Sequence, residues 1–268
     1  GTVTAKSLLA EFALNKKSDA LQRAQALFPH DPDVILVSCL EATSPDSPWL
    51  AALEQMQPGN ALPALIRAGL HASQRNLKQL AEELKKVLSK GAIELNTKGR
   101  EAALIDLVLQ QPAGLDLRES VGAFDYHYYT LVDQIRQTLT KNPGLFGDDL
   151  ATADVGLALA EKMRAVDGGT WTHPFMANHL EHELLSELPP DDLYGTGGLT
   201  VAARRQVLMQ ALEQQMNDIK RLGERIWAPT ADAGIRLQFF LRLRSEGEQA
   251  AVDWLALQYP VPATASKP

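Results

Sequence analysis

The sequence predicts an all-α protein made of antiparallel helical hairpins without a sheet, and two observations support this fold class. Apolar or small residues recur at i, i+3, i+4 and i+7 in most segments, for example from Leu62 to Ser73, which is the spacing of one buried helix face. No segment shows a convincing alternation of apolar and polar residues. The apolar run Val34–Val37 is the best strand candidate, but it follows the helix-start pair Asp31-Pro32 and is therefore interpreted as a buried helix.

Start and stop signals divide the N-terminal half into helices. Asp31-Pro32 and Ser47-Pro48 each combine a capping residue with a proline at the first helical position, whereas Pro58 and Gly91 end helices. The predicted helices are 4–14, 18–28, 32–43, 47–56, 60–74, 76–89 and 98–110, with the first two left open to merging. Their apolar faces predict a core that includes Leu65, Ile66, Leu70, Leu80, Leu84, Leu104 and Leu107.

The C-terminal half carries longer helices. Asp116, followed by Glu119 three residues later, is typical of a capping box. The predicted helices are 116–141, 148–166, 172–188, 200–227, 231–245 and 248–258. The predicted regions are a hairpin array over 1–111, a C-terminal helical region over 112–259 that is separate or continuous with the first, and a disordered tail over 260–268.

Composition excludes several classes of protein. The chain has 268 residues with one Cys, so neither a disulfide framework nor a Cys-rich zinc module is expected. The net charge of −7 argues against nucleic acid as a partner. The longest apolar run, Val34–Leu40, is far shorter than the ~20 residues of a membrane span. No motif predicts a cofactor, and the compartment stays open between cytoplasmic and exported or anchored. Cys39 lies in this apolar run, so we expect it to be buried rather than nucleophilic.

Small residues and prolines in the first 110 residues resemble a repeat pattern. Ala24 and Pro29 lie five apart, Gly69 and Ala81 lie twelve apart, and hairpins begin near residues 32, 60 and 98, on average 33 apart. These features resemble a degenerate tetratricopeptide (TPR) repeat over about residues 4–110, with a weaker echo at 157–162. The aromatic positions of that family are mostly missing. The resemblance implies a TPR-like α-solenoid whose surface binds another protein.

Basic residues on the predicted helix 60–74 suggest where such a partner would bind. Arg67, His71 and Arg75 recur at i, i+4 and i+8, opposite the buried stripe. In a TPR-like hairpin this face lines the concave groove and would hold an unidentified protein or peptide, of acidic character if these residues bind it. A solvated face is the alternative. The further cations Lys85, Lys86 and Lys90 are interpreted as solvated residues that favour a helix C-terminus.

The segment 124–129 contains three of the five tyrosines. Tyr126 and Tyr129 share one face of the predicted helix 116–141, and such amphipathic rings suit a partner-binding surface. The alternative is that the rings pack inside the protein.

Three of the six histidines lie between residues 173 and 182. His179, His182 and Glu183 share a helix face and are weak candidates for metal ligands, with His173 nearby. No established ligand spacing fits them, and a polar helix face is the alternative. The sequence therefore predicts an interaction scaffold without catalytic activity of its own. The alternative is a metal-dependent hydrolase built on His173, His179, His182 and Glu183.

Overall fold

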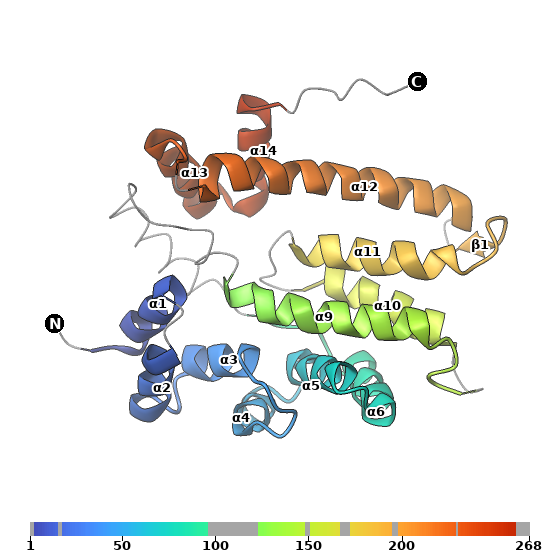
Figure 1. Cartoon of the computed structure of the whole chain (residues 1–268), viewed down its shortest axis with the longest axis horizontal. Coiled ribbons are helices and arrows are strands. Elements are labelled where there is room, and N and C mark those ends of the chain that lie inside the picture. The colour runs from blue at the N-terminus through green and yellow to red at the C-terminus, as the bar shows by residue number, and fades with distance from the viewer. Residues whose placement is uncertain are drawn as a thin grey trace.

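The computed structural model describes residues 3–15, 18–95, 123–147, 151–166, 172–194, 198–228 and 230–260, and within them the side chains of all residues except 13–15, 18, 123–127 and 172. The protein is mostly helical, which confirms the all-α prediction (Figure 1). In the described residues no helix combines the length and the apolar character that crossing a membrane requires.

The N-terminal helices lie close to their predicted positions. They are α1 (Ala5–Asn15), α2 (Ser18–Leu27), α3 (Pro32–Leu40), α4 (Pro48–Met56), α5 (Leu62–Ser73) and α6 (Leu77–Ser89). Asp31 caps α3 as predicted, because its side chain accepts from the backbone N–H groups of Asp33 and Val34. Ser47 precedes α4 but makes no side-chain capping bond. Residues Val34–Leu40 of α3 are all buried, so this apolar run is a helix and not a strand.

The second half contains α9 (Ala123–Lys141), α10 (Thr152–Arg164), α11 (Thr172–Ser186), α12 (Val201–Leu222), α13 (Ala233–Glu246) and α14 (Glu248–Gln258). A π-helical turn, Gly223–Trp227, follows α12. The prediction of no sheet is wrong in one detail, because β1 (Leu193–Tyr194) and β2 (Leu199–Thr200) form an antiparallel ribbon. The predicted helix 98–110 and the capping pair Asp116–Glu119 lie outside the described residues.

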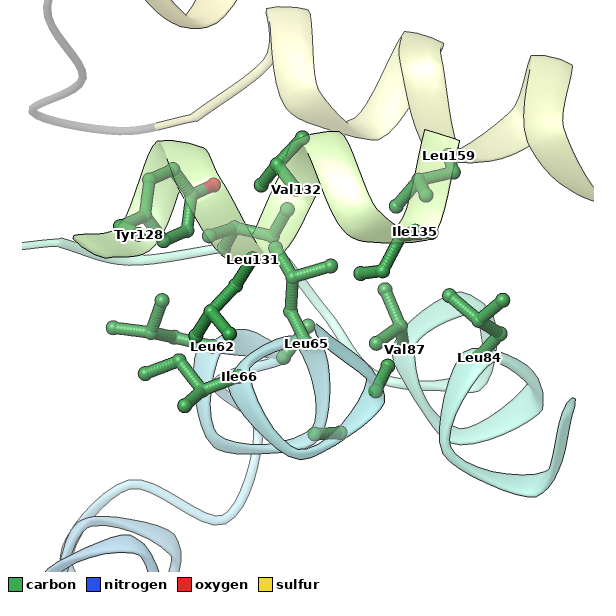
Figure 2. Packing of buried hydrophobic residues seen from close by; sticks show 14 of the residues in the cluster. Leu62, Leu65, Ile66, Leu84, Val87, Tyr128, Leu131, Val132, Ile135 and Leu159 are labelled. Atoms are coloured by element: carbon green, nitrogen blue, oxygen red, sulfur yellow. The ribbon is translucent and has the colours of Figure 1, made fainter. Parts of the chain in front are cut away.

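The largest hydrophobic core is organised around α5. Nine of the twelve residues of α5 are buried, since α6 and α9 both pack against it. Figure 2 shows Leu65 of α5, Val87 of α6 and Ile135 of α9 directed into the same interior. This core reaches from α3 to α11 and therefore continues across the predicted boundary near residue 111.

Gly69 permits the close approach of α5 and α9. A Cβ atom added at Gly69 would lie 2.4 Å from the Cβ of Leu131, closer than packed atoms allow. The TPR resemblance paired Gly69 with Ala81 of the next helix, but the neighbour that requires a glycine is α9, which comes from the other half of the chain. The reason is tertiary: α9 crosses α5 at this glycine (Figures 1 and 2), whereas the helix of the second half that packs against α6 is α10.

The predicted core residues are confirmed where the structure describes them. Leu65, Ile66, Leu70, Leu80 and Leu84 are at most 4% exposed. Leu104 and Leu107 lie outside the described residues. A smaller core joins the π-helical turn to the α13–α14 hairpin. Beside it Arg236 is buried and donates to the carbonyl oxygens of Ile226 and Ala228.

Candidate functional site

A surface groove lies between α6 and the chain that follows α9. Its volume is about 630 Å³. One face of α6 forms one wall of the groove. The end of α9 and the turn after it form the opposite wall. The lining residues, which we call the α6/α9 groove, are Leu77, Lys78, Ala81, Glu82, Lys85, Lys141, Asn142, Pro143, Gly144, Leu145 and Phe146.

The turn that forms the far wall is fixed by local interactions. Pro143 follows the end of α9, and the Asn142 side chain donates to the carbonyl oxygen of Thr138 at 2.7 Å. Phe146 anchors the turn because it is only 6% exposed and packs in the main core. This wall of the groove is therefore a turn fixed by burial and hydrogen bonding and not a free loop.

The rim of the groove carries an excess of positive charge. Lys78, Lys85 and Lys141 are all exposed lysines, and Glu82 is the single acidic residue of the lining. None of the three ammonium groups forms an ion pair with another residue in the part of the chain that the structure describes. They are available for a partner, although the whole protein carries a net charge of −7.

The groove also presents apolar surface. Leu77 is 37% exposed, and Ala81 and Leu145 are half-buried. Leu77 and Ala81 belong to the apolar stripe of α6, whose other members Leu80 and Leu84 are fully buried. Leu77 and Ala81 thus extend the apolar face of α6 beyond the part that the core buries. These additional apolar residues are the sequence signal for the groove.

The basic residues predicted to line a groove on α5 are arranged differently. Arg67 binds Glu54 with Nη1 at 2.9 Å from Oε2, and its side chain is 15% exposed. Arg75 lies beyond the end of α5, with a positive φ of 58°. Arg67, His71 and Arg75 therefore do not form a row along one open helix face. Burial of α5 on most sides explains the difference.

The cations interpreted as solvated also have distinct surroundings. Lys90 donates to Glu54 at 2.5 Å, while Lys86 pairs with Glu83 at 2.7 Å. Only Lys85 keeps a free ammonium group and faces the groove, among these three and within the described residues. The hydrogen bond from Lys90 and the one from Arg67 hold the pKa of Glu54 below its usual value.

The aromatic segment packs inward in the part that the structure describes. Tyr128 is 1% exposed, and its ring lies 5.3 Å from that of His173. Tyr129 is half-buried and lies 5.8 Å from the same imidazole, centroid to centroid. The side chain of Tyr126 lies outside the described residues. These contacts agree with the packing alternative for Tyr129, and binding of a partner by either tyrosine stays untested.

The histidine segment forms α11, and its residues point to different surroundings. His173 is buried against the two tyrosine rings, whereas Glu183 binds Arg136 of α9 and lies 3.7 Å from Nδ1 of His179. Burial, then the charges of Arg205 and His179, lower the pKa of His182. Among the described residues no three His, Cys, Asp or Glu side chains converge as metal ligands. The metal-site hypothesis gains no geometric support.

A buried carboxylate on the same helix was not predicted. Glu181 is 1% exposed and is held by Arg164 of α10 and Arg204 of α12. Arg204 binds it through two nitrogens, Nε at 2.6 Å and Nη2 at 3.0 Å. The sequence signal is spacing: His173, Ala177, Glu181 and Leu185 recur every four residues and are all buried.

Cys39 is buried as predicted. Its thiol donates to the backbone carbonyl of Trp49 at 2.9 Å. Burial raises the pKa of the thiol to about 12, so the reactive thiolate is nearly absent at neutral pH.

Comparison of the chain with models of protein families, with curated proteins and with solved structures found no match.

Proposed function

We propose that this protein is an interaction scaffold of stacked helical hairpins, and that its α6/α9 groove binds an acidic segment of a partner protein. The segment carries at least one large apolar side chain. The TPR-like interpretation of α1–α6 is part of this proposal. The single observation that carries it is the combination, in one groove, of exposed apolar surface and three lysines that form no ion pair with any residue the structure describes.

Charge selects the kind of partner. Three lysines and one glutamate give the lining a net charge of about +2 in a protein whose total is −7. The groove attracts carboxylates, while the rest of the surface repels an acidic chain that approaches elsewhere. The two effects together orient an acidic segment toward this site.

The apolar lining supplies binding free energy that the charges alone do not provide. Exposed ion pairs contribute only about 0–1 kcal/mol each, so a purely electrostatic contact would be weak and salt-sensitive. A Leu or Phe side chain placed over Leu77, Ala81 and Leu145 adds about 1.5–3 kcal/mol through burial. This is why the proposed segment is amphipathic rather than simply acidic.

The size of the groove limits the bound segment. From Leu77 to Lys85 the lining extends over nine residues of α6, and the eight steps between them span about 12 Å at 1.5 Å per residue. That length matches two turns of helix or about four residues of extended chain. The proposed ligand is therefore a short linear segment and not a second folded domain.

Selection from a random peptide display library on the intact, immobilised protein tests the proposal. We expect enriched peptides to combine Asp or Glu with Leu or Phe within a short stretch. Binding of a synthetic enriched peptide should weaken at least about tenfold in a Lys78→Glu/Lys85→Glu variant, because attraction becomes repulsion. Enrichment of basic or purely polar peptides contradicts the proposal.

Glycine variants provide a matched steric control. A Cβ atom added at Gly144 in the groove, or at Gly59 between α4 and α5, meets nothing within 4 Å. Gly144→Trp should fold normally and block the selected peptide, whereas Gly59→Trp should fold and bind like the wild type. Equal binding by the wild type and Gly144→Trp places the peptide elsewhere and overturns the assignment of the groove.

A further inference from the structure

Two arginines lie side by side on the α10–α12 face of the molecule. Arg164 ends α10, and Arg204 lies in the first turn of α12. The buried carboxylate of Glu181 binds both and so fixes the two guanidinium groups next to each other. Neither arginine is part of the α6/α9 groove.

Neighbouring side chains hold this pair in place. Nε of Arg164 donates to Oδ1 of Asn178 at 3.1 Å, and the amide nitrogen of Asn178 donates to Gln215 at 3.4 Å. Arg204 makes two parallel bonds to Glu181, which is the geometry that restrains a guanidinium most strongly. The positions of both cations are therefore set before any ligand arrives.

The pair is not saturated by these contacts. A guanidinium has five N–H donors, and each arginine uses two of them in the bonds given above. In the described part of the chain the remaining donors bond to no other residue. The side chains of Arg164 and Arg204 are 28% and 26% exposed, so these donors are within reach of solvent.

Glu181 alone does not neutralise the pair, because two guanidiniums bind its one carboxylate. Glu161 also acts on Arg164 through its charge, but it forms no ion pair with Arg164. Burial, then the charge of Arg204, lower the pKa of Arg164. A second anion on the solvent side would relieve this repulsion and occupy the free donors.

We propose that Arg164 and Arg204, held by Glu181, form a binding site for a small oxyanion, a phosphate or a carboxylate group. Glu181 positions the arginines and does not touch the ligand. The inference is independent of the α6/α9 groove, and either proposal can fail without the other.

Titration of the intact protein with inorganic phosphate, and separately with acetate at the same ionic strength and pH, tests this site. Calorimetry and the NMR signals of the arginine Nε–H groups report binding. We expect saturable binding with one ligand per chain, and the tighter of the two ligands identifies the oxyanion class. Absence of saturable binding for both ligands overturns the proposal.

Two variants show whether the arginine pair is responsible. Arg204→Gln should weaken binding at least about tenfold, because a charge-assisted donor group is lost. Arg164→Gln should weaken binding by a similar factor, because the proposed ligand is bound by both guanidinium groups. Binding as tight as that of the wild type in either variant, measured on folded protein, overturns the site.

Arg242→Gln is the matched control. The side chain of Arg242 is 35% exposed on α13 and pairs with Glu246, away from Arg164, Glu181 and Arg204 in the sequence and on a helix that packs in a different core. Its replacement removes the same charge and should leave binding unchanged. An equal loss in Arg204→Gln and Arg242→Gln would show that the anion responds only to total charge, which contradicts a site at Arg164 and Arg204.

Discussion

Two carboxylates in this protein are each bound by two cations, and they differ in burial. Glu54 binds Arg67 and Lys90, and its side chain is 35% exposed. Glu181 binds Arg164 and Arg204 and is 1% exposed. Each cluster joins three successive helices: α4, α5 and the end of α6 in one case, and α10, α11 and α12 in the other.

The difference in burial determines what each cluster contributes. If its cations are removed, the carboxylate of Glu54 can return to water, so its pairing is worth little in free energy of folding. The carboxylate of Glu181 has no such alternative, because it would stay in a low-dielectric interior without a counter-ion. The same chemistry is thus a minor contact in one region and a requirement of the fold in the other.

The largest expected effect on the free energy of unfolding comes from removing both cations that bind the buried carboxylate of Glu181. Arg164→Ala/Arg204→Ala should lower the free energy of unfolding by roughly 3–5 kcal/mol at pH 7, since Glu181 is left buried and unpaired. Urea denaturation measures this loss. The matched double variant Arg67→Ala/Lys90→Ala at Glu54 should lose about 1 kcal/mol. Equal losses in the two double variants would refute the role assigned to burial.

A smaller effect is expected when the charge is kept and the geometry is changed. Arg204→Lys retains the cation but cannot form the two parallel bonds that Arg204 makes to Glu181. The free energy of unfolding should fall by about 1–2 kcal/mol, measured in the same denaturation experiment. A variant as stable as the wild type would mean that charge alone holds Glu181.

The smallest effect concerns the exposed carboxylate and its pH dependence. The pKa of Glu54 is lower in the folded protein, so its stabilisation is complete above the unfolded value of 4.5 and is lost as the pH falls through the folded pKa. Glu54→Gln should cost less than about 1 kcal/mol at pH 7. The difference from the wild type should vanish in denaturation experiments well below pH 4.5; a constant difference across pH would contradict this account.

The arrangement of helices along the chain could largely be predicted from the sequence. Predicted and observed ends of α2, α4, α6 and α14 differ by at most one residue. Pro32, Pro48 and the apolar period of α6 act on neighbouring residues only, so local reasoning is sufficient. The ribbon β1–β2 was not predicted, because strands of two residues are too short to show an alternation of apolar and polar residues.

The candidate sites could not be predicted from local sequence patterns in the same way. Arg67 and Lys85 look alike in the sequence, since both lie on the polar side of an amphipathic helix. In the structure Arg67 is paired with Glu54, thirteen residues away, whereas Lys85 lies beside the turn after α9 and has no ion-pair partner among the described residues. Which cation is free depends on the residues that other helices bring to it.

By itself, the sequence determined that this protein is helical, where its helices lie and which apolar faces are buried, because these properties follow from residues within four positions of each other. The tertiary structure alone decided that α9 crosses α5 at Gly69, that Glu181 holds two arginines and that three lysines border one groove. The physical reason is that packing and charge pairing act between segments distant in the chain, and helical periodicity carries no information about which segments meet.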